Sequence, residues 1–349
     1  MANRSSKRPG LKEIAKACGY SVNTVSDILN RGNARLYREE TINKVREVAR
    51  EMNYRPNRAA QAVRKQRMGT IAFLAPNCLN GTELTNYLIY PFLVGANHFL
   101  ITRKFHLLLM EIDEFPAKQA ASPLDEAFAD GFIVHFGIPQ YICEEIIRTG
   151  IPTVWWDSNT MQPMNCINRN EYEVGYRITR ELLDLGHRRI AFYGYELEDD
   201  PITNPGCHYS SRDRYRGYCH AMEEAGLPVL VIERTDVEGI RRNLLAQRPT
   251  AVITLGSSPH CGPAEIAHAA ATIGLKVPDQ LSIASCDLEA RIRPAVFQIG
   301  GMTYDRFQTG WEAAQMLFEI IGNNGKPTSS RSFSGEFRLG HTIAEAPSS

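Results

Sequence analysis

The sequence predicts a small all-α head followed by a larger α/β body of two lobes with parallel sheets. Apolar residues recur at helical spacing through the first part of the chain, whereas beyond residue 68 short apolar runs alternate with helical segments. The charge divides in the same way: residues 1–67 carry 16 Lys and Arg against 6 Asp and Glu, and the remainder has an acidic excess. We therefore place a head at 1–56, a linker at 57–67 and the body at 68–349.

The composition limits the class of protein. A chain of 349 residues suits two or three compact units, and 43% hydrophobic residues suffice for a core. There is no run of 18 apolar residues, and the basic N-terminus lacks the apolar stretch of a secretory signal, so we expect a cytoplasmic protein. The eight cysteines include no C-x-x-C pair, only the adjacent pairs Cys207-His208, Cys219-His220 and His260-Cys261. That spacing does not suit a metal, so we expect reduced thiols, no metal and no cofactor.

Two short helices open the head. Leu11–Cys18 has an apolar face and is followed by Gly19, a residue typical of helix ends. Ser21 can then cap a second helix at 22–29. Two helices joined by a Gly-containing turn have helix-turn-helix geometry, in which the second helix enters the major groove of DNA.

A third helix and a basic segment complete the head. We expect the third helix at 39–53, and Pro56 followed by Asn57 starts a short helix with three basic residues and the exposed aliphatic Val63. Any small helical hairpin would need similar spacing, but the net charge of +10 over residues 1–67 favours DNA binding. The candidate DNA-binding residues are Ser21, Val22, Asn23, Thr24, Ser26, Asp27, Arg35, Tyr54, Asn57, Arg58, Ala60, Gln61 and Val63.

The body contains two successive series of strands and helices, which predict two α/β lobes with a cleft between them. Helices are expected at 83–102 and around 215–224. The expected strands are 70–75, 106–110, 131–136, 152–156, 189–193, 251–254 and 281–285.

Ligands of open α/β sheets bind beyond the carboxyl ends of the strands. Carboxylates, amides and aromatic rings follow several of the expected strands, and these groups suit a polyhydroxylated ligand: carboxylates accept hydroxyl protons and rings stack on the apolar face of a sugar. These candidate effector-binding residues are Asn80, Trp156, Asp157, Asn170, Asp287 and Tyr304.

The segment from Leu11 through Gly69 resembles the lactose-repressor (LacI) family of bacterial regulators. The matching runs are L-K-E-I-A-K-A-C-G-Y-S-V-N-T-V-S-D-I-L-N, then E-E-T, then N-Y-R-P-N-R-A-A, and the similarity continues weakly along the body. The resemblance implies a hinge helix after Pro56 that folds on operator DNA, with Val63 inserted into the minor groove. It also implies a homodimer on a pseudo-palindromic operator.

For the body, the resemblance implies a periplasmic-binding-protein-like core that binds a small effector. Within S-R-D-R-Y-R-G it assigns an effector contact to Arg214, and it matches Asp157 and Asp287 to acidic positions of the family. Other positions depart from the family: Pro259-His260 replaces Asn-Asp, Asn170-Glu171 replaces Asp-Asn, and Tyr304 replaces a frequent Gln. The effector's identity therefore cannot be taken from a relative.

The head departs from the family as well. Asp27 stands where a basic or amide residue usually reaches the major groove, so it either accepts from a cytosine amino group or pairs with Arg31. Our hypothesis is that Val22, Asn23 and Asp27 recognise an operator unlike the common one. The loop 30–38 is about two residues longer than usual and supplies basic residues for phosphate contacts. Val63 is a shorter wedge than the usual Leu.

Two other classes of protein fit the sequence less well. An enzyme would need a catalytic motif, and the chain has no G-x-S-x-G, P-loop lysine, H-E-x-x-H or G-x-G-x-x-G after the first strand. A solute-binding protein would carry a signal peptide and lack the basic head. We therefore expect a DNA-binding regulator controlled by a sugar-like effector, with repression adopted from the resemblance and activation as the alternative. No leucine heptad follows the body, so a tetramerising coil is not expected.

Overall fold

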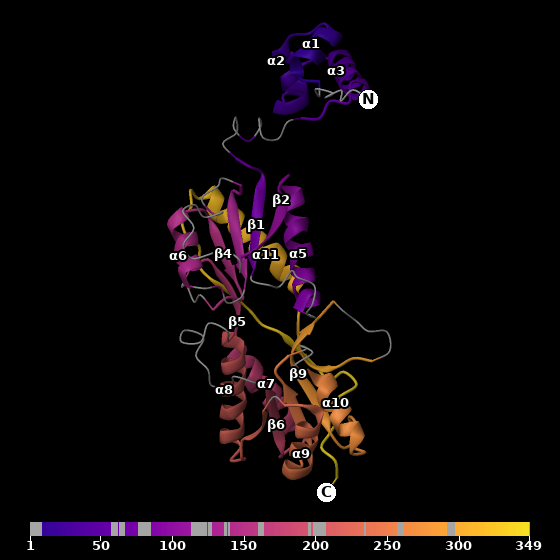
Figure 1. The fold of residues 1–349 in the computed structure, drawn as a ribbon, viewed down its shortest axis with the longest axis vertical. Helices are drawn as coiled ribbons and strands as arrows, with labels where there is room; N and C mark the ends of the chain where they lie inside the picture. The colour runs from indigo at the N-terminus through magenta and orange to yellow at the C-terminus, as the bar shows by residue number, and fades with distance from the viewer. Residues whose placement is uncertain are drawn as a thin grey trace, which may run out of the picture. The chain divides into compact units, whose positions relative to one another are not determined.

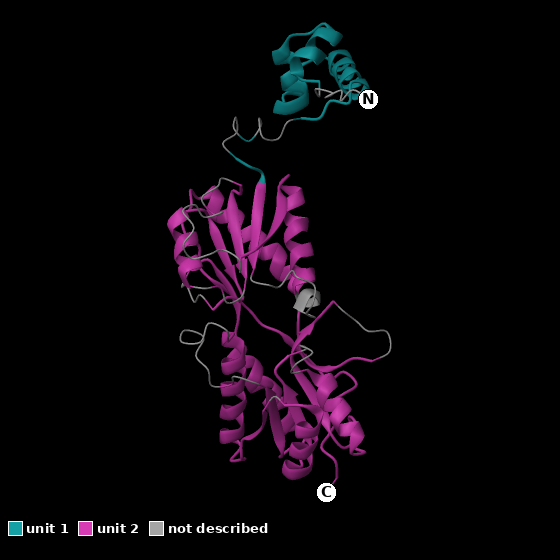
Figure 2. Cartoon of the chain, in the orientation of Figure 1, with its two compact units in different colours: residues 1–69 teal, residues 70–349 magenta. Residues whose placement is uncertain are grey.

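A computed structural model describes residues 9–56, 62, 67–75, 85–112, 124, 128–135, 138, 140–159, 164–194, 197, 207–233, 235–256, 262–291 and 297–348. The chain divides into two compact units, shown in Figure 2: residues 1–69, which contain the predicted head and linker, and residues 70–349, which contain all but the first two residues of the predicted body. A helical head and two α/β lobes with mostly parallel sheets confirm the predicted fold class. Among the described residues, none of the helices combines the length and the apolar composition of a membrane span.

Three helices form the described head, and each exists because one apolar face packs on the others. Their shared core contains Ile14, Val25 and Val45, all fully buried. Two short turns, η1 and η2, lie between the second and third helices. The elements are α1 (Leu11–Cys18), α2 (Val22–Ser26), the π-helical turn η1 (Asp27–Arg31), the 3-10 turn η2 (Ala34–Leu36) and α3 (Glu39–Glu51).

The first lobe is a six-stranded parallel sheet in the order β11-β5-β4-β3-β1-β2, with α5, α6 and α11 packed against it (Figure 1). Its central strands are buried on both faces, which explains their continuous apolar runs. The bounds are β1 (Thr70–Ala75), β2 (His106–Glu111), β3 (Gly131–His135), β4 (Thr153–Trp156), β5 (Cys166–Arg169), β11 (Arg331–Phe333), α5 (Thr85–Thr102), α6 (Gln140–Thr149) and α11 (Arg306–Gly322).

The second lobe repeats this plan in the order β12-β10-β9-β8-β6-β7, and only β12 runs antiparallel to its neighbour. One large apolar core joins the sheet to the helix pairs α7–α8 and α9–α10. The bounds are β6 (Ile190–Gly194), β7 (Leu230–Glu233), β8 (Ala251–Thr254), β9 (Ser282–Glu289), β10 (Gly300–Tyr304), β12 (Glu336–Arg338), α7 (Glu171–Asp184), α8 (Tyr209–Glu224), α9 (Val237–Gln247) and α10 (Pro263–Thr272).

The chain passes between the lobes where β5 leads into α7, where β10 leads into α11, and where β11 leads into β12. A polar side chain caps the helix at each of the first two crossings. Asn170 Oδ1 accepts from the Glu173 amide at 3.2 Å, and Asp305 Oδ1 accepts from the Gln308 amide at 2.9 Å. These crossings bring the carboxyl ends of β5 and β10, and the helices that start there, into the region between the lobes.

Glycines let the helices next to these crossings approach closely. A Cβ added at Gly175 of α7 would lie 1.8 Å from the carbonyl oxygen of Arg214, and one added at Gly217 of α8 would lie 2.0 Å from a carbonyl oxygen of α7. Gly95 and Gly310 play the same role between α5 and α11. The backbone that carries Arg214 is therefore fixed by contact with α7.

Candidate functional site

The N-terminal end of α2 presents the polar surface expected of a recognition helix. Ser21 Oγ accepts from the Thr24 amide at 3.1 Å and therefore caps the helix. Val22 and Asn23 are exposed at this end, as a base-reading pair must be. Ser26, by contrast, is 3% exposed, so its side chain faces the interior of the head.

Asp27 is held by two partners within the head. Tyr37 Oη donates to Oδ2 at 2.8 Å, and Arg31 Nη1 donates to Oδ1 at 3.1 Å. The hydrogen bond from Tyr37, and then the Arg31 guanidinium, lower the pKa of Asp27. Of the two alternatives for this carboxylate, the pairing with Arg31 is therefore present in the structure. Tyr37, supplied by the longer loop 30–38, is the partner that sequence reasoning missed.

Two of the remaining predicted DNA-binding residues, Arg35 and Tyr54, lie in the described part of the head. Arg35 is exposed on η2, and Tyr54 Oη accepts from Asn30 Nδ2 at 3.0 Å. The other predicted positions lie outside the described residues, as does the effector candidate Asn80. Those DNA-binding positions are Asn57, Arg58, Ala60, Gln61 and Val63.

Six charged side chains meet between the lobes, at the carboxyl ends of strands and the first turns of helices. All have side chains that are mostly or fully buried. We call this set the interlobe charge cluster, and it consists of Asp157, Arg169, Glu171, Arg214, Asp287 and Arg306. The sequence predicted three of them as effector-binding residues, namely Asp157, Arg214 and Asp287.

Arg214 is the most fully engaged of the three arginines. Its Nε donates to Glu171 Oε2 at 2.6 Å and its Nη2 to Glu171 Oε1 at 2.7 Å, which is a two-point pair. Nη1 donates to the Leu255 carbonyl at 2.6 Å, and Nη2 also lies 3.5 Å from Asp287 Oδ2. Most of the donors of this predicted effector contact are therefore used within the protein.

The two aspartates are held in their charged form. Burial by itself raises the pKa of Asp287, but the guanidinium groups of Arg169, Arg306 and Arg214 outweigh it and hold the pKa well below its usual range. The same holds for Asp157, where Arg169 is the strongest opposing charge. Both aspartates therefore act as hydrogen-bond acceptors at neutral pH.

Asp157 also links the lobes through α8. Tyr209 Oη donates to Asp157 Oδ1 at 2.7 Å, and Arg169 Nη2 donates to Oδ2 at 2.8 Å. Beside this pair, Asn159 Nδ2 donates to the Cys207 carbonyl at 2.7 Å and accepts from the Tyr209 amide at 2.9 Å. The start of α8 is thus fastened to the end of β4.

The predicted aromatic residues behave differently from each other. The Trp156 ring is nearly parallel to Phe92 at 3.5 Å and to His135 at 4.1 Å between centroids, so these rings must cover its opposite faces. Burial lowers the pKa of His135 to about 4, so it is a neutral stacking partner. Tyr304 instead lies under the guanidinium of Arg169, 4.8 Å from its ring centroid, and its buried hydroxyl has no hydrogen-bond partner within the described residues.

Sequence reasoning missed half of the interlobe charge cluster. Arg169 ends a strand, Cys-Ile-Asn-Arg, that has no continuous apolar run to predict it, and Glu171 was noticed only as a departure from the family. The predicted Asn170 is exposed and caps α7. Arg306 is the first residue of a helix that was not predicted, so only its place directly after Asp305 could have signalled it.

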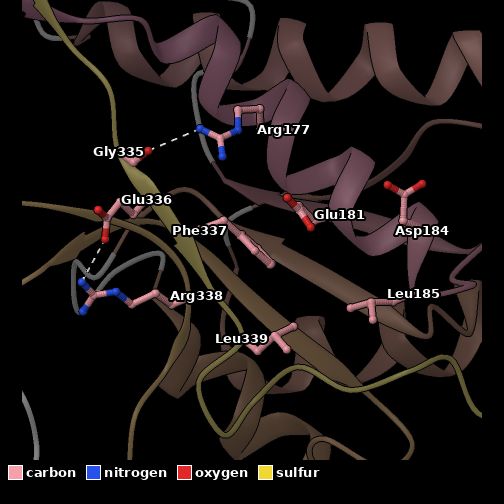
Figure 3. Close-up of a pocket in the computed structure, with 9 residues that line it drawn as sticks. All are labelled: Arg177, Glu181, Asp184, Leu185, Gly335, Glu336, Phe337, Arg338 and Leu339. Carbon is pink, nitrogen blue, oxygen red and sulfur yellow. Dashed lines mark hydrogen bonds and ion pairs between the residues drawn. The ribbon is translucent and has the colours of Figure 1, made fainter.

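A separate open groove of about 1030 Å³ lies between the C-terminal half of α7 and β12 (Figure 3). Arg177 Nη1 donates to the Gly335 carbonyl across it at 3.3 Å, and Arg338 pairs with Glu336 beside it. Its lining residues include none of the predicted effector residues. In the described part of the chain, no group of His, Cys, Asp and Glu has metal-binding geometry, and the six cysteines found there are free thiols.

Comparison with known proteins agrees with both halves of the chain. Residues 10–57 match the family model "Bacterial regulatory proteins, lacI family", and residues 179–343 match "Periplasmic binding protein-like domain". The chain is 30% identical to the HTH-type transcriptional regulator DegA of Bacillus subtilis, over 79% of this chain and 80% of that protein. It is 26% identical to the Ribose operon repressor of Haemophilus influenzae, over 90% and 92% of the two chains.

Solved structures share the fold at lower identity. The lac repressor dimer bound to operator and the anti-inducer ONPF superposes with a TM-score of 0.73 at 16% identity, over 97% of this chain and 100% of that one. A LacI-family regulator from Enterococcus faecium with bound ribose gives 0.62 at 19% identity, over 79% and 99%. With its helix-turn-helix head and two-lobed body, the chain belongs to the LacI family of DNA-binding transcriptional regulators, which are not enzymes.

Proposed function

We propose that this protein is a cytoplasmic repressor that binds a pseudo-palindromic operator as a homodimer and responds to a carbohydrate bound at the interlobe charge cluster. The observation that carries the proposal is the joining of a basic helix-turn-helix head to a body whose lobes meet through buried, hydrogen-bonding charges. Because such contacts depend on how the lobes meet, a ligand that binds one arrangement better than another changes the body's conformation.

For the DNA, we propose that Val22 and Asn23 read base edges while Ser21 and Thr24 fix the start of α2. Asp27 is proposed to order the loop through Tyr37 and Arg31, and direct base reading by Asp27 is the alternative outcome of its test. Arg35 and Tyr54 are proposed phosphate contacts, and Ser26 supports the helix from within. Following the family resemblance, the hinge contacts are proposed for residues 57–63, with Val63 as the minor-groove wedge.

For the effector, the chemistry of the cluster favours a polyhydroxylated molecule. Asp157 and Asp287 are charged acceptors, and Tyr304 supplies a ring and a hydroxyl that has no hydrogen-bond partner among the described residues. Among relatives, one is a ribose operon repressor, and solved structures include regulators bound to ribose and to cellobiose. These names support a sugar as the class of effector here. We further propose that the effector lowers operator affinity, by linkage between the two sites.

For the dimer, an exposed apolar surface on the first lobe supports self-association. Tyr90 and Ile101 of α5 are 67% and 60% exposed, and Leu109 is exposed on the α5 side of the neighbouring edge strand β2. Large exposed apolar side chains that gather on adjacent elements are typical of a surface that another protein covers. Two heads held at fixed spacing can then bind paired half-sites one helical turn apart.

The proposal is tested by selecting operators from random DNA with the full chain and then measuring gel-shift affinity with and without a panel of sugars. We expect a palindromic consensus and a sugar that both raises the thermal stability of the protein and weakens the shift. A chain lacking residues 1–69 should lose the shift and keep the thermal response. The proposed operator binding is contradicted if the selection yields no consensus sequence or if the truncated chain still binds DNA. The proposed carbohydrate effector is contradicted if no sugar of the panel raises the thermal stability of the protein. A reporter gene placed behind the operator distinguishes repression from activation.

A further inference from the structure

Arg169 reaches from one lobe into the charged groups of the other. It is the last residue of β5 in the first lobe, yet its Nη1 lies 2.9 Å from Asp287 Oδ1 on β9 of the second. Its Nη2 lies 2.8 Å from Asp157 Oδ2 and 2.9 Å from Glu171 Oε1. One guanidinium is thus surrounded by three carboxylates, and the ring of Tyr304 covers its face at 4.8 Å.

These surroundings form a complete recognition site for a planar cation. Carboxylates lie around the rim and an aromatic ring covers the flat face, which is how proteins bind free guanidinium ligands. Here the occupant is a side chain of the protein. The groups that a sugar would use as acceptors are therefore already taken by Arg169.

Arg169 is also the most exposed arginine of the cluster. Its side chain is 12% exposed, against 4% for Arg214 and 6% for Arg306. Arg214 makes a two-point pair with Glu171 and a bond to a backbone carbonyl. Nη1 of Arg169 instead faces Asp287 Oδ1 at 2.9 Å without hydrogen-bond geometry toward any described residue. An imperfectly bonded buried group costs less to remove than a fully bonded one, so Arg169 is the member that a ligand can displace.

We propose that Arg169 is a resident ligand of the interlobe charge cluster, and that the effector binds by displacing its guanidinium. The competition with an effector rests on the function proposed above; the occupancy by Arg169 does not. Withdrawal of Arg169 frees Asp157 Oδ2, one contact each on Glu171 and Asp287, and the face of Tyr304. Acceptors around an aromatic ring, next to a Tyr304 hydroxyl that no described residue hydrogen-bonds, suit a ring with several hydroxyl groups.

The first test is chemical rescue of the full chain carrying Arg169→Ala, with ethylguanidinium as the probe. Removing the side chain leaves three buried carboxylates without their shared cation, so we expect a lower melting temperature. Millimolar ethylguanidinium should restore part of the loss, because a ligand that binds only the folded state stabilises it by mass action. Wild type, whose site is filled, should show no rise.

Arg291→Ala is the matched control. Arg291 also pairs with a carboxylate, Asp305, and lies 4.3 Å from the Phe307 ring, but its side chain is about half exposed. The Arg291→Ala variant should lose little stability, and ethylguanidinium should not raise its melting temperature. Should Arg169→Ala fail to fold, Arg169→Gln keeps part of the stem and must show the same rescue. Absence of rescue, or equal rescue of Arg291→Ala, overturns the proposal.

The second test measures the competition itself. With a sugar that stabilises the wild-type protein, Arg169→Ala should bind more tightly, by about tenfold if Arg169 fills the site nine-tenths of the time. Unchanged sugar binding would show that Arg169 does not compete with the sugar, and weaker binding would show that Arg169 contacts it. Either result overturns the proposed displacement. The ethylguanidinium test needs neither sugar nor DNA. It can therefore contradict the occupancy of the cluster by Arg169 without bearing on the proposed function, and the proposed function can fail while this test succeeds.

Discussion

Glu171 offers the sharpest test of how much the interlobe charge cluster contributes to stability. Its side chain is fully buried at the first turn of α7, where the helix dipole also favours an anion. Its oxygens lie 2.6 and 2.7 Å from Arg214 and 2.9 Å from Arg169. Glu171→Ala removes all of these contacts and leaves two buried guanidinium groups short of a partner.

The expected loss follows from that geometry. Removing one member of a buried pair costs about 3–5 kcal/mol, because the remaining charge stays buried. For a unit of this size, each kcal/mol lowers the melting temperature by about 2–4 °C, so a fall of about 10 °C is expected. Urea unfolding should show a lower midpoint with an unchanged slope.

Glu173→Ala is the control, because Glu173 lies two residues further along α7 and is exposed. It should stay within about 0.5 kcal/mol of wild type. A double replacement, Glu171→Leu with Arg214→Met, should regain much of the loss, since it leaves fewer unpaired charges. The reasoning is refuted if Glu171→Ala unfolds within about 1 kcal/mol of Glu173→Ala, a difference too small for a broken buried pair.

Three further outcomes are expected. Gly175→Ala should lower stability by about 1–3 kcal/mol in urea, because the new methyl group would overlap the Arg214 carbonyl, whereas Gly322→Ala, with open space around it, should not. Tyr37→Phe and Asp27→Ala should each weaken binding to all operator sequences alike, and their effects on affinity should be non-additive when the two changes are combined. A relaxed preference at a single base pair would show instead that Asp27 reads that base. Burial lowers the pKa of His135 to about 4, so between about pH 6.5 and about pH 4 only the unfolded chain takes up a proton at this residue. The free energy of unfolding should therefore fall by up to about 3 kcal/mol as the pH drops through that range. The urea midpoint of His135→Gln should lose this pH dependence.

Local pattern determined the framework of this protein. The apolar spacing of Leu11–Cys18 predicts α1 to the residue, and the apolar runs at 70–75 and 251–254 coincide with β1 and β8. The charge of the first 67 residues marked the head. These features follow from the sequence because periodicity, capping and charge are properties of neighbouring residues.

Only the tertiary structure decided which charges meet. Arg169 and Asp287 lie in different strands of different lobes, and nothing near either in the sequence signals their 2.9 Å contact. Trp156 was predicted from its strand end as a sugar-stacking ring, yet the structure covers both of its faces with Phe92 and His135. The lobes come together through three chain crossings, and the partner of a buried charge is set by that packing rather than by the residues beside it.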